Sequence, residues 1–328
     1  MHHIQKKGKH DDLNNYRGIC LQDHIARYVS SIISSRLLIL LKEHGIEEQL
    51  GCQPLRGCCD ALFIVRSALQ IRYKHMHATW VLFVDLVKAF DTIDRELLFE
   101  ILSKFGIPQS MIYVIRRLYA DTEIKISVGT EKGNIKNTMG VKQGDAMAAV
   151  LFILVMQAMA ETLTPLWESA GMATPQFRFH KETKSFYGKM KGQNYKTKGT
   201  MFKLFLSLYV DDGSFMFESR ADMQKGASIL FHHMKRFGLL MHMGRNGGKS
   251  KTEALYIPAP GTIISDADRI KILVDNTDQG YVTFNRKFTY LGSIITENLE
   301  DSAEINARIG KANGILYSLN NLWRSKGL

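Results

Sequence analysis

Apolar residues recur along the chain with a helical period in several segments, and these segments predict most of the helices. The period covers residues 28–45, 59–75, 94–106 and 221–238, each of which is expected to form an amphipathic helix. Gly45 and Gly106 stand where glycine commonly ends a helix, and Asp94 is a suitable N-cap. Pro108 is expected to open a further helix that runs to Tyr119. Residues 140–167 begin as a loop between Gly140 and Gly144 and become a long buried helix.

Shorter apolar runs predict strands between these helices. Residues 80–84 are continuously apolar, which is typical of a strand buried on both faces. Two hairpins are expected, one from 122–128 and 134–139 and one from 204–210 and 214–217. Late strands are expected over 252–258 and 288–296, and residues from 302 onward read as helical. The alternation of strands and helices predicts an α+β fold with helices packed on one side of a sheet.

Length and composition narrow the class of protein. With 328 residues and 45% hydrophobic content, the chain can form two or three subdomains around a large core. An apolar run of about 18 residues is absent from the sequence, so no membrane span is expected. The N-terminal charges precede no apolar stretch, which argues against a secretory signal and favours an intracellular place, nuclear or cytoplasmic. The four cysteines form no CxxC pair, so reduced thiols without zinc are expected.

The charge balance points to a polyanionic partner. The 43 Lys and Arg exceed the 32 Asp and Glu, which gives a net charge of +11. Eight basic residues and one acid lie over 178–203, interleaved with aromatic residues. Such a stretch suits the stacking and phosphate contacts of a nucleic-acid strand, but a solvated insertion would have the same composition. Both interpretations stay open from the sequence.

Three aspartates stand in unexpectedly apolar surroundings. Asp85 follows the buried strand over 80–84, while Asp211 and Asp212 lie in the middle of the apolar hairpin over 204–217. A turn would explain the Asp-Asp-Gly sequence, and an N-cap would explain Asp85. If the two strands are neighbours in one sheet, however, the three carboxylates converge. Such a cluster needs cations and suits two Mg²⁺ ions about 4 Å apart, the arrangement for phosphoryl transfer.

Six sequence blocks in a fixed order resemble the reverse transcriptase domain of non-LTR (LINE-type) retrotransposons. They are NNYRGICL, FVDLVKAFD, GVKQGD, YVDD, GKSKTEAL and FTYLGS, and the resemblance covers nearly the whole chain. It implies a right-hand polymerase with a ferredoxin-like palm sheet. The implied division is fingers over 1–79 with their N-terminal part missing, palm over 80–295, and the start of a thumb over 296–328. The palm would carry a finger-like hairpin at 108–140 and a basic insertion at 164–203.

The resemblance implies an RNA-directed DNA polymerase and assigns its metal ligands. Asp85 and Asp211 match the main ligands of two Mg²⁺ ions, with Mn²⁺ as a possible substitute, and the Leu86 carbonyl assists them. Asp212 matches the accessory carboxylate beside these ligands. The implied partners are an RNA template, a DNA primer and deoxynucleoside triphosphates.

Further residues match nucleotide-binding positions of the family. Phe90 matches the aromatic residue beneath the nucleotide sugar, which excludes a 2′-hydroxyl, although an ordinary core Phe is the alternative. Gln143 matches the glutamine near the nucleotide and template. Lys6 and Arg17 match the basic residues that hold the triphosphate, and Lys7 or Lys9 could replace Lys6.

Two further assignments concern the leaving group and the primer. Lys251 matches the lysine that protonates pyrophosphate, with Lys249 as its rival and a solvated surface lysine as the alternative for either. The strand pair that grips the primer is matched by Phe288, Tyr290, Leu291 and Gly292.

The sequence also departs from the family pattern. Residues 146–149 read Ala-Met-Ala-Ala where the family usually has a Pro-Leu-Ser-Pro-like run, so the template contacts there are in doubt. The resemblance begins inside the fingers and ends early in the thumb, which leads us to expect a retrotransposon-derived fragment. A catalytically silent, reverse-transcriptase-like RNA-binding protein is the alternative. An RNA-directed RNA polymerase is a third, against which Phe90 and the YVDD block argue.

Overall fold

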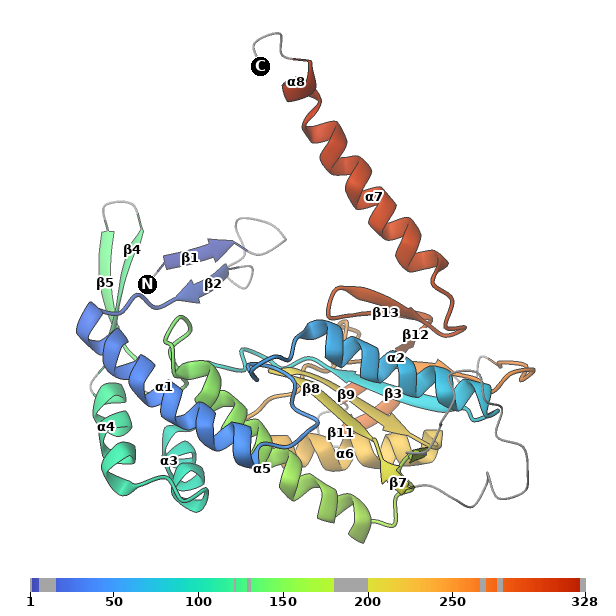
Figure 1. The fold of residues 1–328 in the computed structure, drawn as a ribbon, viewed down its shortest axis with the longest axis horizontal. Helices are drawn as coiled ribbons and strands as arrows, with labels where there is room; N and C mark the ends of the chain where they lie inside the picture. The colour runs from blue at the N-terminus through green and yellow to red at the C-terminus, as the bar shows by residue number, and fades with distance from the viewer. Residues whose placement is uncertain are drawn as a thin grey trace, which may run out of the picture.

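A mixed sheet lies at the centre of the molecule (Figure 1). The computed structural model describes residues 2–5, 16–120, 122–128, 131–179, 200–265, 270–275 and 280–324. The six strands of the sheet run in the order β11-β12-β10-β3-β9-β8, and only β10 and β12 are parallel. Their bounds are β3 (Thr79–Val84), β8 (Leu206–Tyr209), β9 (Asp212–Phe217), β10 (Glu253–Ile257), β11 (Ile272–Asp275) and β12 (Gly280–Asn285).

Helices and small hairpins surround this sheet. The helices are α1 (His24–His44), α2 (Cys58–Lys74), α3 (Arg95–Lys104), α4 (Gln109–Tyr119), α5 (Ala148–Ser169), α6 (Arg220–Arg236), α7 (Ser302–Ser318) and α8 (Asn320–Trp323). The hairpins pair β1 (His2–Gln5) with β2 (Tyr16–Ile19), β4 (Glu123–Val128) with β5 (Glu131–Lys136), β6 (Gln176–Phe179) with β7 (Thr200–Lys203), and β13 (Lys287–Tyr290) with β14 (Ser293–Thr296). Figure 1 shows α7 projecting away from the sheet, on the side where α2 and β13 lie.

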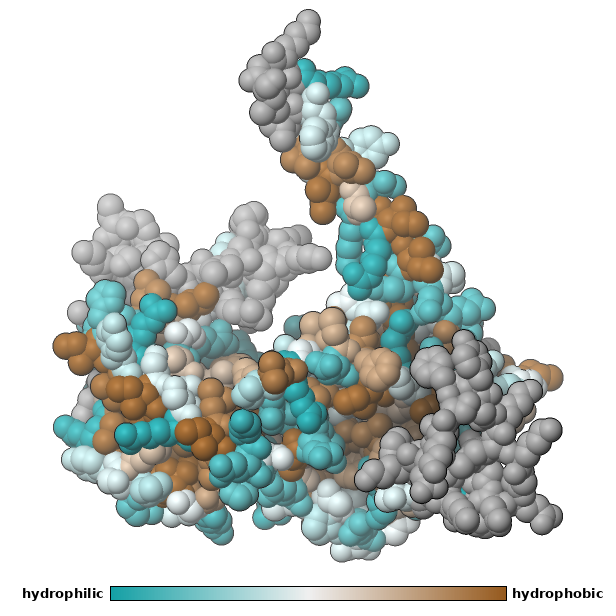
Figure 2. Space-filling model, in the orientation of Figure 1, coloured by the Kyte–Doolittle hydropathy of each residue, from teal (hydrophilic) through white to brown (hydrophobic). Residues whose placement is uncertain are grey.

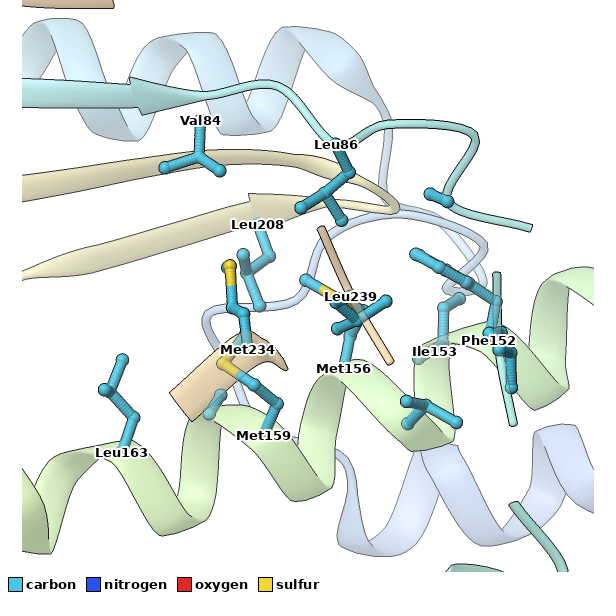
Figure 3. Packing of buried hydrophobic residues seen from close by; sticks show 14 of the residues in the cluster. Val84, Leu86, Phe152, Ile153, Met156, Met159, Leu163, Leu208, Met234 and Leu239 are labelled. Atoms are coloured by element: carbon cyan, nitrogen blue, oxygen red, sulfur yellow. The ribbon is translucent and has the colours of Figure 1, made fainter. Parts of the chain in front are cut away.

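The two faces of the sheet pack against different elements. Leu82 and Val84 of β3 join the larger core with α5 and α6, while Val81 and Phe83 join a second cluster with α2 and β13–β14. Figure 3 shows Val84 and Leu208 pointing from the sheet toward the methionines of α5 and α6. Burying each such side chain contributes about 1.5–3 kcal/mol. The predicted α+β class is confirmed. The prediction that helices pack on one side of the sheet only is wrong, because α2 lies against β3 and β8 on the second face.

Most predicted helices are present, with boundaries that local hydrogen bonds explain. Helix α1 begins at His24, four residues before the predicted start, because the Asp23 side chain accepts a hydrogen bond from the Ala26 amide. Asp94 caps α3 as predicted, accepting from the amides of Glu96 and Leu97. Helix α5 continues to Ser169, so residues 164–169 belong to this helix and not to the predicted insertion. Trp167 in that last turn is buried in the larger core.

Hairpin turns differ most from expectation. The run over 288–296, which its apolar pattern predicts as one strand, is the hairpin β13–β14 with Leu291 and Gly292 between its strands, the strand pair that the family resemblance implies. Strand β5 begins at Glu131, three residues before the predicted start at residue 134, and pairs with β4 up to Val128. Strands β11 and β12 were not predicted, although both are short runs of mainly β-branched and aromatic residues.

The basic insertion is described only at its base. Residues 180–199 lie outside the described residues, and with them most of the predicted cations and aromatic residues. Phe177 of β6 is buried and stacks on Phe202 of β7, with ring centroids 5.6 Å apart. Phe177, just before the basic stretch, therefore packs in the second cluster, against β3.

Two helices in the described part of the chain, α1 and α5, are long and apolar enough to cross a membrane by length and composition. Over the most apolar window of α5, 61% of the residues are buried inside the protein, as in the core helix of a soluble protein. Length and composition alone are a weak indication of a membrane span.

Candidate active site

Strand pairing brings the three aspartates to one end of the sheet. Val84 of β3 pairs with Gly213 of the antiparallel neighbour β9, so the next pair in this register is Asp85 with Asp212. Tyr209 pairs with Asp212 to close the β8–β9 hairpin, which leaves Val210 and Asp211 as its two-residue turn. The predicted adjacency of the two strands is confirmed, while the turn lies one residue earlier than Asp-Asp-Gly.

The backbone of Asp85 is held from the opposite side by the segment before β10. Its carbonyl accepts a hydrogen bond from the His242 amide at 2.8 Å. Its own amide donates to the Thr252 hydroxyl at 3.2 Å. Leu86 then bridges to Met241. Sequence reasoning missed His242 and Thr252, because neither stands in a pattern that marks it.

The three carboxylates influence one another. The pKa of Asp212 is raised from 3.8 to about 6, first by desolvation and then by the negative charges of Asp211 and Asp85. Carboxylate oxygens that repel each other are the donors that Mg²⁺ prefers, so the residue set fits divalent metal ions. Within the described residues, however, no group of three or more His, Cys, Asp or Glu side chains is arranged as a ready metal site. The fold thus brings the three aspartates to one end of the sheet, and their described side chains are not arranged as a metal site.

Lys251 lies beside this cluster. Its amide donates to Nδ1 of His242 at 3.3 Å, and the next residue, Thr252, binds Asp85. Lys249 and Lys251 both have exposed side chains. Lys251 is thus the sequence neighbour of Thr252, which contacts the Asp85 backbone. Its predicted role in protonating pyrophosphate stays a prediction.

Phe90 is partly buried at the edge of the larger core. Its ring stacks on Phe152 of α5, with centroids 4.7 Å apart and planes 18° from parallel. Its carbonyl accepts from the Val141 amide at 2.7 Å, which joins the turn after Asp85 to the loop that carries Gln143. One face of the ring is thus fixed by packing while the residue keeps some exposed surface.

The Gln143 loop contacts strand β2 closely. The Gln143 carbonyl accepts from the Cys20 amide at 2.7 Å. Gly144 has a φ of +99°, and a Cβ there would lie 2.9 Å from the Cys20 carbonyl oxygen, so only glycine fits. Arg17 lies in β2, which places it on this side of the site, but its side chain and the whole of Lys6, Lys7 and Lys9 fall outside the described residues.

The predicted primer-gripping hairpin β13–β14 is attached to the sheet through its aromatic residues. Phe288 stacks on Phe83 with centroids 4.2 Å apart, and Tyr290 is 2% exposed. The pKa of Tyr290 is raised mainly by burial, with a small contribution from the charge of Asp212. Of the four predicted residues, Gly292 at the turn is the exposed one.

Comparison with known proteins agrees with this arrangement. Residues 4–295 match the family described as "Reverse transcriptase (RNA-dependent DNA polymerase)". The chain is 27% identical over 150 residues to the retrovirus-related Pol polyprotein from type-2 retrotransposable element R2DM of Drosophila melanogaster, covering 45% of this chain and 14% of that protein. It is 25% identical over 171 residues to the Pol polyprotein from type-1 retrotransposable element R2 of Popillia japonica, covering 52% of this chain and 23% of the relative.

A solved structure shares the fold. An apo telomerase from Candida tropicalis, truncated from its C-terminal domain, aligns with a TM-score of 0.50 and 14% sequence identity, covering 83% of this chain and 44% of that one. The chain thus spans less than half the length of these relatives. The resemblance to non-LTR retrotransposon domains is confirmed by the R2 relatives. The family match over residues 4–295 shows that the chain belongs to the reverse transcriptase (RNA-dependent DNA polymerase) family.

Proposed function

We propose that this chain is the catalytic part of a retrotransposon-derived reverse transcriptase, which extends a DNA primer on an RNA template by two-metal nucleotidyl transfer. One observation carries the proposal: the antiparallel pairing of β3 with β9 sets Asp85 next to Asp212 and beside the turn that holds Asp211. Rigid strands fix such side chains more closely than loops would.

In this proposal Asp85 and Asp211 would hold the ions, and Asp212 would assist them. When bound, the ions would supply the positive charge that phosphoryl transfer requires. The protein itself would orient the nucleotide, with Phe90 beneath its sugar and Gln143 beside its base. Lys251 would donate a proton to the leaving pyrophosphate, because its side chain is exposed and its backbone adjoins the residues that hold Asp85.

The shape and charge of the molecule support a nucleic-acid substrate. Figure 2 shows a hollow beside the projecting helix α7, on the side of the sheet where α2 and β13 lie in Figure 1. Val81 and Phe83 face this side, and in this proposal Asp85 would continue their alternation, so that its carboxylate would open toward the hollow. The net charge of +11 favours a polyanion there.

Primer extension tests the proposal directly. The protein should extend oligo(dT) on poly(rA) with dTTP and Mg²⁺. Asp85→Ala and Asp211→Ala should each lower the rate by about 1,000-fold or more, because they remove charge stabilisation worth several kcal/mol. Asp222→Asn is the matched control, since this carboxylate lies in the first turn of α6, which starts beyond the far end of β9, and should leave the rate unchanged.

A wild-type protein that binds RNA but extends no primer would contradict the proposal and support the catalytically silent RNA-binding alternative. Extension with ribonucleotides in preference to deoxynucleotides would support the RNA polymerase instead.

A further inference from the structure

The turn that carries Asp211 has a backbone that its sequence does not favour. Val210 has a φ of +59°, in the left-handed region where β-branched residues are genuine outliers. Such a conformation persists only where the surrounding structure imposes it. The two-residue turn between Tyr209 and Asp212 therefore needs support from outside the β8–β9 hairpin.

Gln49, 161 residues earlier in the chain, supplies that support. Its Oε1 accepts hydrogen bonds from the Val210 amide at 3.0 Å and from the Gly51 amide at 2.9 Å. Its Nε2 donates to the Val210 carbonyl at 3.4 Å. Two amide donors at one end and a carbonyl acceptor at the other fix which way the side-chain amide points. The Gln49 side chain thus hydrogen-bonds to both the amide and the carbonyl of Val210.

The segment around Gln49 is itself locked to the sheet. Leu208 donates to the Glu48 carbonyl and the Leu50 amide donates to the Leu208 carbonyl, each at 2.8 Å, which covers the outer edge of β8. Gly51 lies so close that a Cβ there would be 2.5 Å from the Val210 nitrogen. Gln49 is only 1% exposed, so its hydrogen bonds form away from competing water.

We infer that Gln49 is a positioning residue, which holds the Val210–Asp211 turn so that the Asp211 carboxylate points to where a divalent ion would bind. This inference rests on the proposed function of Asp211. Gln49 touches neither substrate nor ion in this role and acts through the backbone of Val210 alone. Removing its acceptor oxygen should free the turn while leaving the hydrophobic core in place.

Gln49→Met tests this inference, because methionine has a similar shape and no strong acceptor. Hydrogen exchange of the peptide that contains Val210 should accelerate by about ten-fold or more. Turnover in primer extension should fall by roughly 10- to 100-fold, the effect of a misplacement of about 1 Å, with the KM for primer–template changed by less than about two-fold. The dissociation constant for Mn²⁺, measured by electron paramagnetic resonance, should rise by about three-fold, in proportion to the lost orientation of Asp211.

Two variants make these readouts specific. Gln49→Glu keeps an oxygen that accepts from both amides, and burial favours its protonated form, whose hydroxyl can donate to the Val210 carbonyl in place of Nε2. In that form it should retain exchange protection and turnover within a few-fold of the wild type. Gln157→Met removes another buried glutamine, which donates to the His44 carbonyl and to Glu161, and should leave turnover and Mn²⁺ binding unchanged. If Gln49→Met does not fold, Gln49→Asn takes its place, because the asparagine side chain is one methylene shorter and cannot reach both polar groups of Val210. This variant should show the same losses, and unchanged exchange and turnover in Gln49→Asn would overturn the inference.

The outcomes separate the inference from the proposed function. Asp211→Asn with undiminished extension would overturn the proposed function. Asp211→Asn without activity, combined with unchanged exchange, turnover and Mn²⁺ binding in Gln49→Met, would overturn the positioning role alone. Equal losses in Gln49→Met and Gln157→Met would also overturn it, since general destabilisation would then explain both.

Discussion

At the scale of single residues, Asp212 shows how the fold changes the acidity of a carboxyl group in the site. Its pKa is raised from 3.8 to about 6, chiefly by desolvation and then by Asp211 and Asp85. Between pH 3.8 and about 6, Asp212 binds more protons in the folded state than in the unfolded state. The free energy of unfolding therefore falls as the pH rises through this range. Above pH 6 without metal, the ionised Asp212 therefore destabilises the protein.

This sign gives a test in metal-free buffer. Asp212→Asn should have a higher melting temperature than the wild type above pH 6, and the difference should vanish below about pH 4, where both forms are neutral. Mg²⁺ should narrow the difference at high pH, because a cation offsets the repulsion. A difference that is the same at pH 4 and pH 7.5 would show that the shift has another cause.

Phe90 offers a second prediction at this scale. Phe90→Val should raise the ratio of ribonucleotide to deoxynucleotide incorporation by about ten-fold or more, because the ring no longer occupies the space of a 2′-hydroxyl. Steady-state kinetics with dTTP and UTP measure the ratio. Phe105→Val is the matched control, since Phe105 is also partly buried against the core but follows α3. If both variants discriminate as the wild type does, Phe90 is a packing residue stacked on Phe152.

The sequence reveals a site residue only when its immediate neighbours in the chain mark it. Asp85 stands out because it ends a continuously apolar strand, and the structure confirms that strand. The position of the turn at Val210 was not predictable, because Asp-Asp-Gly is the better turn sequence by propensity. Gln49, which stabilises the observed turn, lies 161 residues away. A contact over that distance leaves no trace in the pattern of either segment.

At the scale of elements, Arg95 joins three of them at the edge of the site. Its guanidinium donates to the carbonyls of Tyr119, Asn137, Met139 and Gly140, and to Oδ1 of Asn137, at 2.7–3.1 Å. It therefore ties the start of α3 to the end of α4 and to the segment between β5 and the Gln143 loop. The sequence pattern predicts α3, α4 and the β4–β5 hairpin, but it contains no signal that one side chain connects them.

Arg95→Lys should lower the free energy of unfolding by about 2–3 kcal/mol, because an ammonium group cannot reproduce the planar set of donors. Urea unfolding measures the change. Arg116→Lys in the adjacent helix is the control: its pair with Glu96 is exposed, so the loss should stay below about 1 kcal/mol. Similar losses in the two variants would contradict the role of Arg95 as the connection between these elements.

At the scale of the whole molecule, the charge of +11 should appear as salt-dependent binding of nucleic acid. Neutralising Lys189, Lys191, Lys196 and Lys198, which lie outside the described residues, should reduce the slope of log K against log[salt] by about two to four units if all four contact phosphate. Filter binding at several salt concentrations measures the slope. An unchanged slope would leave the insertion without a part in binding.

Four other exposed cations provide the control for that experiment. They are Lys104, Lys225, Lys235 and Arg236, at the end of α3 and on α6. Helix α6 packs on the sheet face opposite to α2 and β13, so neutralising these residues should leave the slope almost unchanged. An equal fall in slope for both sets would indicate a general effect of net charge.

The overall class was readable from the sequence because strands and helices alternate with clear periods and six motifs keep their order. The smaller elements were not. Strands β11 and β12 complete one side of the sheet, and their apolar runs, ILV and YVTF, are typical of strands. Each run is short and stands between polar and charged residues, so neither was predicted as a strand from the sequence. Helix α2 was found by its periodicity, yet only the structure shows that it covers the second face of the sheet.

The most direct test of the carboxylate site is an experimental structure of the protein with primer–template, a deoxynucleotide and Mg²⁺. The distance between the carboxylate oxygens of Asp85 and Asp211 should be short enough for both to contact one cation, at the adjoining ends of β3 and the β8–β9 turn. Because the two ions of such a site lie about 4 Å apart, a separation of more than about 8 Å would contradict the two-metal reverse transcriptase proposed for this chain.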